Sequence, residues 1–352
     1  MTLIRTPFAK SRNSRVIISI LFAIGVSLSG CGGSPSISDK QQIYLGDAQQ
    51  EANIQNTARA QHYVDLAIKL NPKDKSLYYD DSPNPDPESL NIAGIFTDAN
   101  DDPSLVKYMT IAVSYFPTAV TPRMMLMNSE DRLGDRAAEH ADALALIALL
   151  EPQTHVPAMS ENSTNFQDLG QAYFAIGNMS AGKKSMEQAI LVASHDAKPD
   201  AENGLAYYIA VENMKSSLPE AAQLVKQALY SVRGADLGSQ DAITKALKQV
   251  TISGPGPDPA TVAAEYYDTQ AWVQYRQANY SQAMTSSFNA LNGLPRVPEI
   301  HYHMAMIYLA VNDVPDATSE LRNALAINPT YAAAKQALQK MPSPGKPVAT
   351  SK

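Results

Sequence analysis

One glycine- and lysine-containing segment comes close to a phosphate-binding sequence. Residues 177–185 read Gly-Asn-Met-Ser-Ala-Gly-Lys-Lys-Ser, and their spacing is that of a loop whose backbone N–H groups hold phosphates. That loop requires Ser or Thr directly after its first lysine, where this chain has Lys184. A phosphate-binding loop also follows a β-strand, whereas residues 177–185 follow a helical pattern that carries Leu169 and Tyr173. We therefore predict a turn between paired helices and no nucleotide binding.

Two other groups of side chains have atoms that could bind a metal ion. The acidic run from Asp98 to Asp102 supplies oxygen ligands, but Pro103 stands where a calcium loop needs glycine and Met109 where it needs glutamate. His301 and His303 are two residues apart, so they point to different faces of a helix and cannot share a metal. We predict a solvated loop for the acids, helix-surface or groove positions for the histidines, and no metal or other cofactor.

Cys31 is the single cysteine of the chain, so it cannot form an intramolecular disulfide. It follows four basic residues with no acidic one, and then an apolar run over residues 16–28. This order is that of an export signal. A helix of that run is about 20 Å long, too short to cross a hydrocarbon core of about 30 Å. We predict that residues 1–30 are removed during export.

The sequence Leu28-Ser29-Gly30-Cys31 resembles the lipobox of bacterial lipoproteins. The resemblance implies that the Cys31 sulfur takes a diacylglycerol and that Cys31 becomes the first residue of the mature protein. Residues 31–40 would then be the lipidated cysteine and a flexible tether. Gly32 stands where an aspartate would mark inner-membrane retention, and so the resemblance favours the outer membrane, facing the periplasm.

Charge argues against polyanionic partners. The whole chain has a net charge of −7, and without residues 1–30 it has 24 Lys and Arg against 35 Asp and Glu. Nucleic acid is therefore not expected as a partner. Membrane binding would come from the acyl chains, which contribute about 0.8 kcal/mol per buried CH₂.

A repeat organises the rest of the chain. Alanine and leucine recur three and four residues apart without sustained alternation, which predicts an all-α fold. The segment 264–296 matches the segment 298–331 after a shift of 34 residues, with alanine at 271 and 305, at 283 and 317, and at 290 and 324. This period resembles tetratricopeptide repeats, which are antiparallel helix pairs stacked into an α-solenoid. Small residues at these positions let the paired helices approach closely.

The repeats divide the chain into regions. We predict a divergent helical region at 41–152, repeats at 153–235, an insert and loop at 236–263, repeats with a capping helix at 264–340, and a disordered tail at 341–352. The divergent region is expected to hold one helix pair at 103–151 with its turn at Gly134-Asp135. The repeat that begins near Ala201 needs about three extra residues in its turn at 214–217.

The first helix of each pair should line a concave groove where a peptide or partner helix docks. The predicted groove residues are Gln167, Gln171, Phe174, Tyr208, Asp268, Trp272, Tyr275, Arg276, Tyr302 and Met306. Trp272 is the only tryptophan, and with its neighbouring arginine it has the composition of an interface anchor. It could equally pack against the neighbouring repeat.

The sequence therefore predicts a non-enzymatic, lipid-anchored scaffold that binds envelope proteins or peptides in an assembly, secretion, pilus or exopolysaccharide system. No zinc-protease helix motif or Gly-x-Ser-x-Gly motif is present. An alternative is an envelope polysaccharide-binding protein or a cell-wall enzyme. Self-assembly is a third possibility, against which the predicted capping helix at 332–339 argues.

Overall fold

A computed structural model describes residues 36–81, 89–155, 162–233 and 259–341, and all regular elements in these ranges are helical. The α-helices are α1 (Ile37–Asn53), α2 (Thr57–Leu70), α3 (Lys75–Tyr78), α4 (Ile92–Asp98), α5 (Asp102–Tyr115), α6 (Val120–Leu133), α7 (Arg136–Leu150), α8 (Ser163–Ala175), α9 (Met179–Val192), α10 (Lys198–Val211), α11 (Leu218–Arg233), α13 (Pro259–Arg276), α14 (Tyr280–Gly293), α15 (Pro298–Ala310), α16 (Val314–Ile327) and α17 (Ala332–Gln339). Two short 3₁₀ helices are η1 (Glu151–His155) and η2 (Lys215–Ser217). The all-α prediction is confirmed.

The helices form hairpins with the predicted period. Helices α14 and α16 begin at Tyr280 and Val314, and helices α15 and α17 begin at Pro298 and Ala332, so each start recurs after 34 residues. Packed pairs are α1 with α2, α8 with α9, α10 with α11, α13 with α14 and α15 with α16. The described part of the chain is therefore an array of helical hairpins, and the starts of α14 to α17 follow the tetratricopeptide period.

Small residues stand where the paired helices meet. Ala271, Ala283, Ala305 and Ala317 are completely buried. At Gly182, where the repeat pattern has alanine elsewhere, an added Cβ would lie 2.9 Å from ring atoms of Phe174. Larger side chains at these positions would push the helices apart.

The phosphate-loop-like segment begins at the turn between α8 and α9, as predicted, and continues into α9, which starts at Met179. Asn178 caps α9, because its side-chain oxygen accepts a hydrogen bond from the N–H of Ala181 at 3.2 Å. The Lys183 ammonium lies 2.8 Å from the Glu220 carboxylate at the start of α11. Its charge therefore joins two successive hairpins.

The extra turn residues between α10 and α11 are also confirmed, since they form η2. The predicted capping helix is α17, and Ala334 within it is completely buried. Its first residue touches α6, because a Cβ added at Gly134 would lie 3.0 Å from the Cβ of Ala332.

The N-terminal third differs from the prediction in one respect. The turn at Gly134-Asp135 is present, but residues 102–133 form two helices rather than one. Helix α5 ends at Tyr115 and α6 begins at Val120, with Pro117 between them. Proline lacks the N–H that an uninterrupted helix needs and its ring clashes with the preceding turn. This region therefore contains α5, α6 and α7 instead of a single pair.

Two region boundaries also differ. Helix α1 begins at Ile37 because Ser36 and Asp39 form a capping box, so the helical body starts inside the predicted tether of residues 31–40. Helix α13 begins at Pro259, so it includes the end of the predicted insert. The predicted signal peptide, Cys31 and most of the insert and tail lie outside the described residues.

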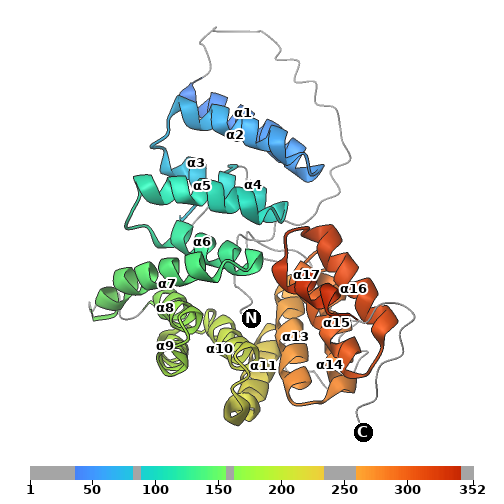
Figure 1. Cartoon of the computed structure of the whole chain (residues 1–352). Helices are drawn as coiled ribbons and strands as arrows, with labels where there is room; N and C mark the ends of the chain where they lie inside the picture. Colours follow the sequence, from blue (N-terminus) through green and yellow to red (C-terminus); the bar gives the residue numbers. More distant parts are fainter. Residues whose placement is uncertain (1–35, 82–88, 156–161, 234–258, 342–352) are drawn as a thin grey trace.

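The array curves back on itself (Figure 1). From α6 it runs through α7, α8 and α9 to α10 and α11, and returns through α13 to α16 until α17 lies beside α6. Helices α1 to α5 extend from this ring (Figure 1). Among the described residues no helix is long and apolar enough to cross a membrane.

Candidate functional site

The predicted groove residues of the two middle repeats are largely buried. Phe174 on α8 and Tyr208 on α10 stack with ring centroids 4.9 Å apart, and their exposed fractions are 2% and 1%. They form part of the contact between successive hairpins. The prediction that these two rings line an open groove is wrong, because successive inner helices approach closely enough for the rings to pack together.

The two glutamines of α8 lie on the same side of the helix. The Gln171 amide donates a hydrogen bond to Oδ1 of Asn128 on α6 at 2.5 Å, and both side chains are buried. Gln167 is half-buried and donates to the Ser163 hydroxyl at 3.3 Å. Gln171 therefore joins α8 to α6 rather than offering its amide to a partner.

Trp272 lies in the centre of an aromatic stack. The Tyr275 ring stacks on the Trp272 ring with centroids 4.7 Å apart, and the His303 ring stacks on it with centroids 4.1 Å apart. The Arg276 guanidinium lies 4.8 Å from the centre of the Trp272 ring, within the range of a cation–π contact. With Trp272 only 4% exposed, the alternative that this tryptophan packs against the neighbouring repeat is the one that the structure supports.

Arg276 also joins α13 to α10. Its Nε donates to the backbone oxygen of Ala210 at 2.7 Å, and its terminal nitrogen donates to that of Val211 at 3.1 Å. These carbonyls belong to the last turn of α10, where helices leave backbone oxygens without an intrahelical partner and where a positive charge is favoured. Arg276 is therefore a cap supplied by the next repeat.

The two histidines of α15 have separate carboxylate partners. Nδ1 of His303 is 2.9 Å from Asp268 on α13, and Nδ1 of His301 is 2.5 Å from Glu320 on α16. They face different neighbours as predicted, but both are buried, so the prediction of surface or groove positions is wrong. Glu320 helps to raise the pKa of His301 against the effect of burial, which lowers it.

The remaining predicted groove residues lie at the same inner surface. Tyr302 is 4% exposed and meets Tyr331 edge-on with ring centroids 5.8 Å apart. Met306 is half-buried against the same apolar core. Asp268, Trp272 and Tyr302 are thus internal contacts, whereas Tyr275, Arg276 and Met306 are partly exposed.

A buried ionic contact closes the ring. Asp102, predicted to lie in a solvated loop, is 1% exposed and accepts a hydrogen bond at 2.6 Å from Nε of Arg132 on α6. Its second carboxylate oxygen accepts from the Asn328 amide at 2.7 Å. Burial alone would lower the pKa of Arg132, but the Asp102 carboxylate raises it. Asp102 therefore joins α5, α6 and the end of α16, a role that its neighbouring residues in the sequence could not reveal.

Helix α6 carries further acids into the interior. Burial raises the pKa of Glu130 to about 8, and the nearby charges of Asp142 and Asp135 raise it further. Burial raises the pKa of Asp131 to about 7 although the Arg136 guanidinium lies 2.6 Å away. These carboxyls belong to the packing of α6 against its neighbours, so their altered proton affinity concerns stability first.

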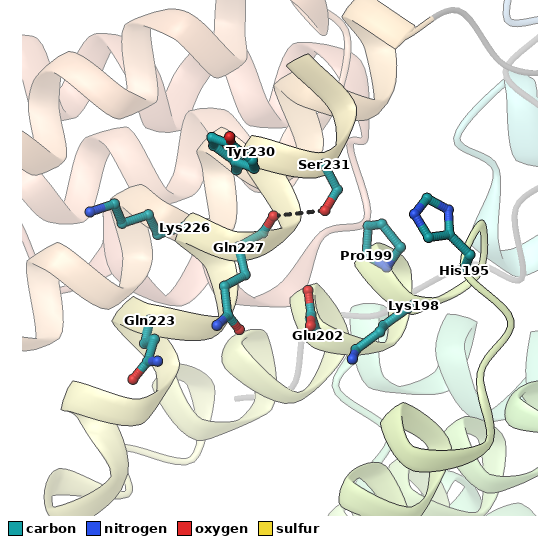
Figure 2. Close-up of a pocket in the computed structure, with 9 residues that line it drawn as sticks. All are labelled: His195, Lys198, Pro199, Glu202, Gln223, Lys226, Gln227, Tyr230 and Ser231. Atoms are coloured by element: carbon teal, nitrogen blue, oxygen red, sulfur yellow. Dashed lines mark hydrogen bonds between the residues drawn. The ribbon is translucent and has the colours of Figure 1, made fainter. Parts of the chain in front are cut away.

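A surface hollow of about 500 Å³ lies between α10 and α11 (Figure 2). The first turns of α10 contribute Lys198, Pro199 and Glu202, and the preceding loop contributes His195. Helix α11 provides the other lining residues, which are Gln223, Lys226, Gln227, Tyr230 and Ser231. Those on α11 are exposed and fall on one face of the helix, opposite to the buried Val225 and Leu229.

Glu202 differs from the other charged residues of the hollow. Its exposed fraction is 7%, and it has no hydrogen bond or ion pair among the described residues. Its neighbour Asp200, by contrast, accepts a hydrogen bond from the Tyr266 hydroxyl of α13. Burial raises the pKa of Glu202, and the charge of Lys198 offsets this only in part. The hollow thus combines a buried acid with lysines at its rim (Figure 2).

Sequence reasoning did not identify this hollow. Glu202 follows Ala201 at the start of a helix, a common place for an acid. Its special environment depends on α11 residues that come more than twenty positions later, and on the loop that places His195 beside them. Only the α10–α11 hairpin brings these residues together.

Comparisons with known proteins place the chain near helical-repeat structures. No protein-family model and no curated protein sequence matches it. A tetratricopeptide repeat protein from Parabacteroides merdae is 13% identical over 85% of this chain and 98% of its own, with a TM-score of 0.46. The anaphase-promoting complex assembly Cut9–Hcn1 is 13% identical over 87% of this chain, with a TM-score of 0.45. The chain covers 48% of that structure's chain, about half of its length.

A third structure, the TPR2AB domain of yeast Sti1 in its pHSP90 complex, is 16% identical over 71% of this chain and 95% of its own, with a TM-score of 0.23. These scores are low, and the repeat assignment rests on the helix pairs of this chain. Among the described residues no group of three or more His, Cys, Asp or Glu side chains is placed to hold a metal ion. The best-supported candidate site is the α10–α11 hollow.

Proposed function

We propose that this protein is a lipid-anchored, non-enzymatic scaffold that holds partner proteins close to a membrane of the bacterial envelope. The observation that carries the proposal is the ring of helical hairpins. Much of its inner surface is occupied by its own stacked and hydrogen-bonded side chains, whereas the α10–α11 hollow lies at the surface. Stacked hairpins of this kind present extended surfaces for binding.

The start of α1 supports a location near the bilayer. Helix α1 begins at Ile37, so residues 32–36 alone separate it from Cys31, a separation of at most about 20 Å when fully extended. A diacylglycerol on Cys31 would therefore keep α1 next to the membrane surface. Because Gly32 stands where an aspartate would mark inner-membrane retention in lipoproteins, we propose that the protein lies at the outer membrane, facing the periplasm.

In-cell crosslinking of the full chain tests the scaffold function. A photoreactive amino acid is placed either at Gln227, on the rim of the hollow, or at Phe288, which is 49% exposed on α14. We expect discrete protein adducts in the membrane fraction. Adducts at neither position, or recovery of glycan instead of protein, would contradict the scaffold and favour polysaccharide binding.

Anchoring is tested separately with the variant Cys31→Ala. Metabolic labelling with palmitate should mark the natural chain and leave the variant unlabelled, and the variant should retain its signal peptide in intact mass measurements. Labelling of both chains would contradict the role of Cys31, without bearing on partner binding.

A further inference from the structure

The identity of the group bound in the α10–α11 hollow rests on the proposed scaffold function and on the lining of the hollow. We propose that the hollow binds a short extended segment of a partner protein, in which a lysine or arginine enters toward Glu202 and an adjacent acidic residue meets the lysines of the rim. Charge, hydrogen-bonding groups and dimensions each support this occupant.

The buried acid specifies the group that enters. Glu202 is 7% exposed as a residue, and its carboxylate has no hydrogen bond or ion pair among the described residues, so the charge of Lys198 compensates only in part for the direct ionic interaction that it lacks. An ammonium or guanidinium group restores that interaction, and such charge-assisted hydrogen bonds are the stronger ones in proteins. An anionic ligand would meet the Glu202 carboxylate at the floor of the hollow, so simple anions are disfavoured.

The lysines at the rim of the hollow favour a partner segment with an acidic residue next to the basic one. Lys198 and Lys226 are exposed and line the hollow from α10 and α11. Neither forms an ion pair among the described residues, whereas Lys183 on α9 pairs with Glu220 and Glu187. A ligand with a basic group alone would be repelled by these lysines, and an acidic residue beside it converts the repulsion into attraction.

The length of the hollow fits a short peptide segment in an extended conformation. Its α11 lining runs from Gln223 to Ser231, which corresponds to about 12 Å at 1.5 Å per residue. Three to four residues of an extended peptide span about this distance, at roughly 3.3 Å each. Gln223 and Gln227 are four positions apart and lie on one face of α11 (Figure 2). The Gln223 amide can both donate to and accept from a peptide backbone, and the half-exposed Tyr230 ring provides a contact for the aliphatic part of the basic side chain.

Photo-crosslinking from Gln227 in the full-length chain tests the proposal, with Phe288 as the second crosslinking position. Glu202→Gln keeps the size of the side chain and removes its charge, and it should lower the adduct yield from Gln227 by about tenfold. Lys226→Glu should also lower that yield, and because Lys226 is exposed it does not threaten folding. The matched control Lys184→Glu makes the same charge change at an exposed position of α9 outside the hollow, and should leave the yield unchanged.

Mass spectrometry of the crosslinked peptide gives the second readout. A basic residue next to an acidic residue within a few positions of the adduct supports the proposal. Unchanged yields from Gln227 in both hollow variants, or a crosslinked segment without a basic residue, would overturn it. Adducts from Phe288 but not from Gln227 would overturn this site and leave the scaffold function standing, whereas adducts from neither position would overturn both.

Discussion

The side-chain amide of Asn328 donates a hydrogen bond to Oδ2 of Asp102 at 2.7 Å, across 226 positions of sequence. The other oxygen of the same carboxylate accepts from Nε of Arg132 at 2.6 Å. One buried acid thus binds the end of the last hairpin and the central helix α6 together. These two hydrogen bonds hold the ring closed, because the buried polar groups of Asn328, Arg132 and Asp102 find their partners in one another where the ends of the ring meet.

Removing the charge of Asp102 should destabilise the whole protein. In Asp102→Asn the buried Arg132 guanidinium loses its counter-charge, and breaking one side of a buried ion pair costs about 3–5 kcal/mol. Asn328→Ala removes a single hydrogen bond to the charged group and should cost about 1–3 kcal/mol. Urea unfolding followed by far-UV circular dichroism measures both.

The control Asp81→Asn affects an ion pair that is about half exposed and should change the free energy of unfolding by less than about 1 kcal/mol. Equal effects at positions 81 and 102 would show that the closure is unimportant.

Stability should fall as the pH rises toward neutrality. In the unfolded chain the carboxyls of Glu130 and Asp131 titrate at ordinary values near 4.5 and 3.8, whereas in the folded chain their pKa values are about 8 and about 7. Between these values the folded state binds more protons, so each group lowers the free energy of unfolding by up to about 1.4 kcal/mol per pH unit as the pH rises. Glu130→Gln should give a flatter profile than the natural chain in urea unfolding measured from pH 5 to pH 8. Parallel profiles would contradict the raised pKa of Glu130.

Two glycine substitutions should have opposite effects on stability. A Cβ at Gly293, the last residue of α14, would lie 2.5 Å from the Cβ of Ala264, whereas a Cβ at Gly46 in α1 would meet nothing within 4 Å. Gly46→Ala should therefore stabilise by about 0.5–1 kcal/mol through helix propensity alone. Gly293→Ala should destabilise by about 1–3 kcal/mol because α13 and α14 must separate. Thermal unfolding of the two variants in parallel checks the sign, and a stabilising change at position 293 would contradict the close contact.

The single tryptophan offers a spectroscopic test of the aromatic stack. Because Trp272 is 4% exposed, its fluorescence in the natural chain should be blue-shifted and poorly quenched by acrylamide. Arg276→Ala removes the cation over the ring and the two hydrogen bonds to α10, and should cost about 1–3 kcal/mol of stability and increase quenching. Arg322→Ala, at an exposed position of α16, is the control and should leave the emission unchanged. Efficient quenching in the natural chain would show instead that Trp272 faces an open groove.

The repeats could be predicted from the sequence because their determinants are local. Alanines at 271, 283, 305 and 317 recur with the period, and the structure buries all four at the helix contacts. A capping helix after Pro329 could be predicted in the same way, from a helix-breaking residue followed by an amphipathic pattern. The spacing of these residues shows which of them share a face of a helix, and the pairing of the helices into hairpins can be predicted from those faces.

The state of the inner surface could not be predicted, because it depends on how strongly the array curves. Phe174 and Tyr208 lie on the faces that a more open solenoid would leave free for a ligand, yet here they stack on each other. Asp102 has the sequence surroundings of a loop acid, and its partners belong to distant helices. The Glu202 hollow was missed for the same reason, since two helices and a loop must come together before the acid becomes buried.

The placement of α17 against α6 changes how the protein comes apart. In an open repeat array each hairpin depends only on its neighbours, so the end units can fray and detach one at a time. Here the last helix rests on the sixth, and a Cβ at Gly134 would already touch Ala332. Loss of any hairpin between α6 and α17 also breaks the contact between these two helices, so the stability of the two ends of the ring is coupled. We therefore expect the ring to unfold in one cooperative step, and a truncation that removes α17 to expose the surface of α6 on which it rests.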